Sequence, residues 1–199
     1  MIISPVFTNF IATESLKLDN AKLESFCQNA RASLNGRTYS NDKGWQSPNI
    51  DLKTPELQDL LNEVSKSLAE LHSHFKFRDT LRLAVWEAWI NINPKGAFNY
   101  SHNHPGAVFS CVYYVKSEPD MGNIVFRTPN IMQPFTITGE MVTSYDTFTM
   151  DEMEIAPRTG SLLIFPAWLV HFVRPNESDQ DRISIALNCV LKKNMDLGF

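Results

Sequence analysis

The first part of the chain carries apolar residues at three- and four-residue steps, the period of an amphipathic helix. Asp19 and Asn20 can cap a first helix. Its apolar face comprises Leu23, Phe26, Cys27, Ala30 and Leu34. Thr54 and Pro55 are typical of an N-cap followed by a first helical residue. The second helix then continues to about residue 76 on the stripe Leu57, Leu60, Leu61, Val64, Leu68, Leu71 and Phe75.

From residue 81 the apolar pattern changes to the period of two that is typical of strands. Strands are expected at 81–92, 107–115, 124–126, 135–143, 148–155, 161–165, 171–174 and 182–191. Turns rich in Gly, Pro, Asn and Asp separate them. Many short strands at this spacing indicate an antiparallel sandwich or barrel. We therefore expect a mainly β (α+β) fold with the N-terminal helices packed on one outer face of a sheet.

The length and composition limit the classes to which the protein can belong. With 199 residues, no internal repeat and no low-complexity linker, we expect a single domain over 1–199. Within it, 1–80 forms a helical support region and 81–199 the β-barrel core. The net charge is −4 and no run of Lys or Arg occurs, so a nucleic-acid partner is disfavoured. No apolar stretch approaches the roughly 20 residues of a membrane span, and the N-terminus lacks the features of a signal peptide.

The cysteines indicate the compartment. Cys27, Cys111 and Cys189 are odd in number, widely spaced and set among apolar residues. They are interpreted as reduced core residues of a cytoplasmic protein, not as a disulfide framework.

Three histidines of the β region form a candidate metal site. His102 and His104 are separated by one residue, so both side chains point to one face of an extended chain. His171 follows the corner Phe165-Pro-Ala-Trp168, again where a strand is expected to begin. Two ligands near one strand and one from a distant strand leave part of the metal open. His72 and His74 end the second helix, where a positive charge suits the helix dipole, and are taken as structural.

The type of metal site follows from what surrounds these histidines. Imidazole suits zinc, iron, copper and nickel, so the ligand type alone does not decide. A structural zinc site is normally closed by four side chains, often cysteines. The three cysteines lie in apolar surroundings and none resembles a fourth ligand. An open, catalytic site is therefore expected.

A candidate anion receptor lies eleven residues after His171. In Arg182-Ile-Ser-Ile185, Arg182 and Ser184 fall on one face and the two isoleucines on the other. A guanidinium followed two positions later by a hydroxyl suits a carboxylate. The alternative is a structural ion pair of Arg182 with an acidic residue such as Glu87.

The order of these motifs resembles the 2-oxoglutarate- and Fe(II)-dependent oxygenases. More narrowly, it resembles a small bacterial and phage subfamily with an Asn-x-x-His-x-His-Pro motif and a Phe-Pro corner before a histidine. Here these motifs are Asn99-Tyr-Ser-His-Asn-His-Pro105 and Phe165-Pro-Ala-Trp-Leu-Val-His171, and Ser110–Tyr114 and Gly44–Ser47 also fit. The resemblance implies a double-stranded β-helix, a jelly-roll or cupin-like barrel, that holds Fe(II) and uses 2-oxoglutarate and molecular oxygen.

The resemblance also implies roles for individual residues. His102, His104 and His171 correspond to the metal ligands, although the superfamily normally has a carboxylate where His104 stands. Either His104 is a third imidazole ligand, which we favour, or Asn103 or a water completes the site. Arg182 and Ser184 would receive the distal carboxylate of 2-oxoglutarate. Additional cofactor contacts are expected from Tyr114, Ser110 and Asn188. Trp89 is expected to line the same cavity. Trp45, Gln46 and Ser47 are placed over its mouth, unless Trp45 is a packing anchor.

Two other functions stay open at this point. A cupin-like metal enzyme that does not use 2-oxoglutarate fits the glycine and histidine spacing, but the glutamate expected after the second histidine is missing. A non-catalytic barrel that binds a ligand is the second alternative. The favoured expectation is a dioxygenase, and specifically a hydroxylase, of a small molecule or a protein side chain. A homodimer through an exposed edge strand is conceivable.

Overall fold

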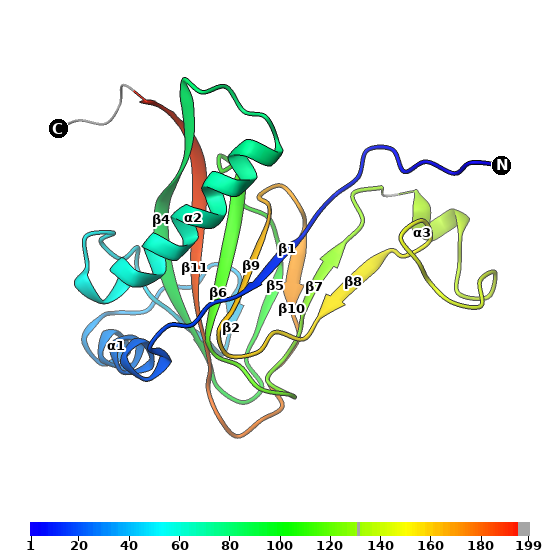
Figure 1. Ribbon diagram of the computed structural model, residues 1–199. Coiled ribbons are helices and arrows are strands. Elements are labelled where there is room, and N and C mark those ends of the chain that lie inside the picture. Colours follow the sequence, from blue (N-terminus) through cyan, green and yellow to red (C-terminus); the bar gives the residue numbers. More distant parts are fainter. Residues whose placement is uncertain (131, 195–199) are drawn as a thin grey trace.

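The computed structural model contains two antiparallel sheets, and two long helices cover the larger one (Figure 1). The structure describes residues 1–130 and 132–194. The larger sheet has the order β1-β9-β6-β11-β4-β3. Its strands are β1 (Ala12–Ser15), β9 (Ser161–Pro166), β6 (Phe109–Lys116), β11 (Arg182–Lys193), β4 (Leu81–Asn93) and β3 (Trp45–Gln46). The smaller sheet, in the order β2-β5-β10-β7-β8, comprises β2 (Asn41–Asp42), β5 (Phe98–His102), β10 (His171–Val173), β7 (Ile124–Arg127) and β8 (Glu152–Ile155).

The helices form where the three- and four-residue spacing predicted them. Helix α1 (Asn20–Ser33) begins after Asp19, whose side chain accepts a hydrogen bond from the backbone N–H of Lys22 at 3.0 Å. A 3₁₀ turn, η1 (Pro55–Leu57), leads into α2 (Gln58–His74). The apolar residues of both helices pack against one face of the larger sheet. None of the helices among the described residues is long and apolar enough to cross a membrane.

The period-two pattern of the larger sheet divides its side chains between two environments. From β11, Ile183, Ile185 and Leu187 pack under the helices, whereas Arg182 and Ser184 line a cavity between the sheets. A smaller apolar cluster also joins the two sheets, formed by Tyr114, Ile124, Phe126, Leu163, Phe165 and Leu169. The helix-covered face thus supplies most of the core, and the other face is free to be polar.

Several strand predictions are corrected by the structure. The strand expected at 135–143 is wrong, because the short helix α3 (Gln133–Thr136) and turns occupy this part, and no strand pairs with it. Only Glu152–Ile155 of the expected strand 148–155 is extended. Strand β5, which carries His102, was not expected, and neither were β1, β2 and β3. These short strands have little pattern of their own. β1, β2 and β3 each pair with a longer strand, whereas β5 pairs with the shorter strands β2 and β10, so all four depend on their tertiary context more than on propensity.

Buried cysteines agree with the expectation from their sequence context. Cys27, Cys111 and Cys189 are free and buried in the core under the helices. The sulfurs of Cys111 and Cys189 lie 3.6 Å apart on neighbouring strands, where one thiol can donate a hydrogen bond to the other, and no disulfide joins them. Burial raises the pKa of Cys27 to about 12, so its thiol stays protonated and unreactive.

Candidate metal centre and co-substrate cavity

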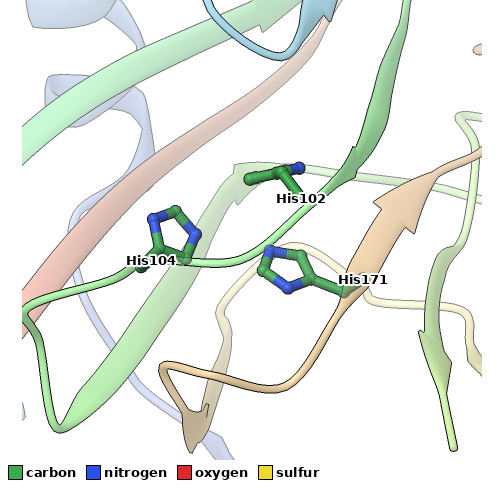
Figure 2. Close-up of side chains that lie close together, drawn as sticks. All are labelled: His102, His104 and His171. Carbon is green, nitrogen blue, oxygen red and sulfur yellow. The ribbon is translucent and has the colours of Figure 1, made fainter. Parts of the chain in front are cut away.

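The three histidines of the candidate site converge from the smaller sheet and the loop that follows β5 (Figure 2). His102 ends β5 and is the cross-strand partner of His171, the first residue of β10. His104 lies two residues past β5, where its backbone N–H donates to the carbonyl of Ala167 at 2.8 Å. One nitrogen from each ring lies within 4.8 Å of those of the other two. The chain thus places three imidazole nitrogens around one point.

Backbone carbonyls fix the ring orientation of two of these histidines. Nδ1 of His171 lies 2.9 Å from the carbonyl oxygen of Leu169, and Nδ1 of His102 lies 2.6 Å from that of Tyr100. Since a carbonyl only accepts, each Nδ1 carries the proton and each Nε2 presents a lone pair. Nε2 of His102 lies 3.5 Å from the hydroxyl of Ser40, which can donate to it. Such a second contact is the usual way in which a protein orients a metal-binding imidazole.

Burial keeps the cluster neutral. It lowers the pKa of His171 to about 3, and the neighbouring His102 acts in the same direction. Burial and His102 lower the pKa of His104 to about 4, although Glu87 partly opposes this shift. The pKa of His102 is also lowered by burial. Three neutral imidazoles at neutral pH are the form that binds a metal ion.

The donor set fits Fe(II). Three nitrogen ligands on one side of an ion leave positions for a bidentate co-substrate and oxygen, as in the open sites of non-haem iron oxygenases. Among the described residues, no cysteine or carboxylate joins the cluster. The three rings are therefore suited to an open site and not to a closed structural one.

A cavity of about 620 Å³ extends from the histidines across the inner face of the larger sheet. On the side of the larger sheet, the lining side chains come from alternate positions of β4, β11 and β6 and form rows across the strands. One row joins Asn91, Ser184 and Tyr114; the next joins Trp89, Ala186 and Val112; the third joins Glu87 and Asn188, beside Ser110, which does not itself line the cavity. The ring of His104 lies 5.7 Å from that of Trp89 in the middle row, and the ring of His171 lies 4.8 Å from that of Phe165, which continues the third row on β9.

Arg182 lies buried at one end of these rows, with 3% of its surface exposed. Its Nη1 donates to the carbonyls of Met121 and Gly122 at 3.0 and 2.9 Å. Burial lowers the pKa of Arg182, and the nearby Tyr114 partly opposes this shift. Burial also raises the pKa of Tyr114 to about 12, so its hydroxyl is neutral and can donate a hydrogen bond. Among the described residues, Arg182 forms no ion pair, and Glu87 hydrogen-bonds to Asn188 and Asn49 instead. The alternative of an Arg182–Glu87 pair is therefore wrong.

Glu87 and two polar side chains from the first third of the chain were underestimated from sequence. Glu87, Trp89 and Asn91 alternate with Ala88 and Ile90, a pattern that could have marked a polar face inside a barrel. Gln46 lines the cavity, as expected, whereas Trp45 packs on the core under the helices and is an anchor. Arg37 and Asn49, also in the lining, carry no sequence signal, because loop residues reach the cavity only through folding.

Comparison with known proteins identifies the family. Residues 87–188, which contain the three histidines and Arg182, match the model of the family described as "Putative 2OG-Fe(II) oxygenase". The chain belongs to the 2OG-Fe(II) oxygenase family. The activity of this family is 2-oxoglutarate-dependent oxidation at a non-haem iron, and its cofactors are Fe(II) and 2-oxoglutarate. A search of curated protein sequences found no significant match.

Solved structures confirm the double-stranded β-helix fold of this oxygenase. A prolyl-4-hydroxylase from Pseudomonas putida is similar with a TM-score of 0.65 and 16% identity, over 92% of this chain and 93% of that one. HygX from Streptomyces hygroscopicus, with nickel and 2-oxoglutarate bound, has a TM-score of 0.64 and 14% identity, over 92% and 83%. The α-ketoglutarate-dependent epimerase SnoN from nogalamycin biosynthesis has a TM-score of 0.67 and 12% identity, over 92% of this chain and 76% of that one. At these identities the likeness concerns the fold.

Proposed function

We propose that this oxygenase is a hydroxylase whose Fe(II) is held by His102, His104 and His171. The observation that carries the ligand assignment is the convergence of three neutral imidazole nitrogens within 4.8 Å. Bound there, Fe(II) and 2-oxoglutarate would supply the oxidising chemistry, in which molecular oxygen oxidises the substrate and 2-oxoglutarate is converted to succinate and carbon dioxide. The contribution of the chain is to orient, neutralise and shield the reacting groups.

The 2-oxoglutarate is proposed to lie between the histidines and Arg182. With Nη1 engaged by two carbonyls, Nε and Nη2 of Arg182 remain for the distal carboxylate. Ser184 and Tyr114 stand side by side in the adjacent row and can each donate a hydroxyl proton. A dianionic co-substrate also balances the charge of Fe(II), which three imidazoles leave uncompensated. The contacts expected from Ser110 and Asn188 stay a prediction, since both lie in the row farthest from Arg182.

The remaining proposals concern the location, the domain organisation, the substrate class and the oligomeric state of the protein. Free cysteine thiols favour a cytoplasmic enzyme formed by a single domain over 1–199. The absence of a basic run in the sequence favours a small molecule or protein side chain over nucleic acid as substrate. A homodimer is proposed only as an arrangement to be tested by light scattering.

The direct test of the proposed function is the conversion of 2-oxoglutarate to succinate by the purified enzyme without added substrate. We expect succinate to form only when Fe(II), ascorbate and oxygen are present together. Two results would reject the assignment. Succinate could form at the same rate when Fe(II) is omitted, or a folded protein that binds the metal could form no succinate under any condition. A cupin-like enzyme and a binding module both predict this second result.

The lowered pKa values predict a weak pH dependence of metal binding. Since the imidazoles of His104 and His171 stay neutral to about pH 4, protons do not compete for them between about pH 8 and about pH 6. We expect Co(II) affinity to change less than about threefold over this range, measured by absorption titration. Three imidazoles with ordinary pKa values near 6.5 would instead lose most of their affinity, and that result would contradict the burial of the site.

Gly122 is expected to control the position of Arg182. Its φ is +90°, and a Cβ there would collide with the carbonyl oxygen of Arg174 and lie 2.9 Å from Nη1 of Arg182. Gly122→Ala should raise the KM for 2-oxoglutarate about tenfold, the effect of about 1.4 kcal/mol. Gly96→Ala is the matched control, because Gly96 also has a positive φ of +79° but no atom within 4 Å of the added Cβ. Equal KM values in the two variants would contradict the prediction.

A further inference from the structure

The cavity has a second polar end, opposite Arg182. Along β11, Arg182 and Asn188 are six residues apart, about 20 Å in an extended strand. His104 lies beside Trp89 of the middle row, and His171 lies beside Phe165, at the far end of the row that begins with Glu87. A five-carbon co-substrate that reaches from Arg182 to the metal therefore leaves Glu87 and Asn188 free. Substrate must reach the metal from the space that remains.

A chain of hydrogen bonds at this second end converges on Glu87. Ser110 Oγ donates to Asn188 Oδ1, and Asn188 Nδ2 donates to Glu87 Oε1, both at 2.8 Å. From the other side, Arg37 Nη2 donates to Asn49 Oδ1 at 2.5 Å, and Asn49 Nδ2 donates to Glu87 Oε2 at 2.8 Å. Because the carbonyl of each amide is engaged elsewhere, both amides must present N–H groups to the carboxylate. The position of Glu87 is thus fixed from both sides.

Glu87 forms no direct ion pair among the described residues. The ion pairs among the described residues are formed by other side chains. Of the acidic residues that the structure describes, only Glu87 lines the cavity. Arg37 reaches it only through Asn49, and its guanidinium lies 5.0 Å from the ring centre of Tyr39. Each oxygen of Glu87 accepts one amide bond and retains a lone pair. A partly buried carboxylate of this kind is stabilised by a cation.

An independent observation also indicates a ligand that donates hydrogen bonds. Gln46 is only 5% exposed and lines the cavity, yet its Oε1 has no partner among the described residues. Asn91, its neighbour across β3 and β4, has a buried Oδ1 in the same condition. Buried acceptors are normally satisfied. These two amide oxygens require donors, although they lie in the row of Ser184 and Tyr114, two rows from Glu87. Arg37 Nε, a buried donor of the same lining without a partner among the described residues, requires an acceptor in turn.

We propose that Glu87 recognises the substrate, and that the substrate carries an ammonium or guanidinium group. Such a group supplies both the positive charge that Glu87 lacks and N–H donors for the cavity. The inference rests on the proposed function, because it takes the Arg182 end to be filled by 2-oxoglutarate. A free basic amino acid and a lysine or arginine side chain of a protein share this chemistry.

The test measures binding to the enzyme loaded with Co(II) and 2-oxoglutarate, by calorimetry. The probes are matched pairs that differ in charge: L-arginine with L-citrulline, and L-lysine with L-norleucine. The same side chains are also presented in end-capped pentapeptides. We expect the charged member of at least one pair to bind at least about tenfold more tightly, as for one additional charged hydrogen bond. Preference confined to free amino acids identifies a small molecule, and preference in the peptides identifies a protein side chain.

Two variants connect the preference to the residue. Glu87→Gln keeps the shape and removes the charge, so the ratio of dissociation constants within the pair should fall to about one. Glu63→Gln is the matched control, since Glu63 is paired with Lys66 on α2, away from the cavity, and should keep the preference. Any of three results overturns the proposal: the charged and neutral probes bind equally, no charged probe binds, or the preference for the charged probe persists in Glu87→Gln.

Failure of this inference is distinguishable from failure of the proposed function. Succinate formation without substrate tests Fe(II) and 2-oxoglutarate use and needs no probe. An enzyme that forms succinate but shows no charge preference retains the function and loses the inference. An enzyme that forms no succinate loses the function whatever the probes do.

Discussion

Replacement of His104 by alanine is expected to weaken Co(II) binding at least about 100-fold and to reduce succinate formation below about 1% of the wild-type rate. Changes to residues that merely support a metal ligand already cost about 10- to 100-fold in affinity, so loss of a ligand should cost more. His104 faces His102 and His171 with ring centres 5.1 and 5.2 Å away. Absorption titration with Co(II) and a succinate assay measure the two effects.

Substitution of His104 tests the proposed ligand set most directly, because the family resemblance places a carboxylate at this position. His104→Asp restores that carboxylate and should recover metal binding to a large extent, which also shows that the fold tolerates substitution here. His74→Ala is the matched control, since His74 is exposed at the end of α2 and outside the cluster. If His104→Ala binds Co(II) within about threefold of the wild type, the site has two histidines and another ligand.

Replacement of Arg182 by methionine is expected to raise the KM for 2-oxoglutarate at least about 30-fold. Truncation of one partner of a buried, hydrogen-bonded charge pair costs about 2–5 kcal/mol, and each 1.4 kcal/mol is about tenfold. Methionine approximates the aliphatic stem, so the apolar packing of this buried side chain is largely kept. The initial rate of succinate formation against 2-oxoglutarate concentration gives the KM.

Arg182→Lys separates charge from geometry. Lysine keeps the positive charge but has no planar fork, so an intermediate increase in KM is expected. Arg174→Met is the matched control, because Arg174 is half-exposed and its Nε pairs with Glu154 at 3.0 Å outside the cavity. Co(II) affinity should be unchanged in Arg182→Met, since Arg182 is outside the histidine cluster. A normal KM in this variant would leave the enzyme without its proposed carboxylate receptor.

The long periodic segments were predictable from sequence. Helices α1 and α2 and the strands β4, β6, β9 and β11 follow apolar patterns that persist over many residues. The alternation of Arg182 and Ser184 with Ile183 and Ile185 correctly assigned the two faces of β11. Strand β5 escaped detection because its few residues, Phe98–His102, include polar side chains that line the cavity. The expected strand at 135–143 failed for the opposite reason, since suitable residues found no neighbour to pair with.

Imidazole and guanidinium chemistry is a property of the side chain, so the residues that can hold a metal and a carboxylate were recognisable without a structure. Their faces were recognisable too, since the period of a strand is local. The fold was needed to show that His102 lies opposite His171, that Arg182 is not paired with Glu87, and that Asn49 and Asn188 hold Glu87 from both sides. These relations join strands and loops that are distant in sequence, and their register is set by how two sheets pack, which no local pattern contains.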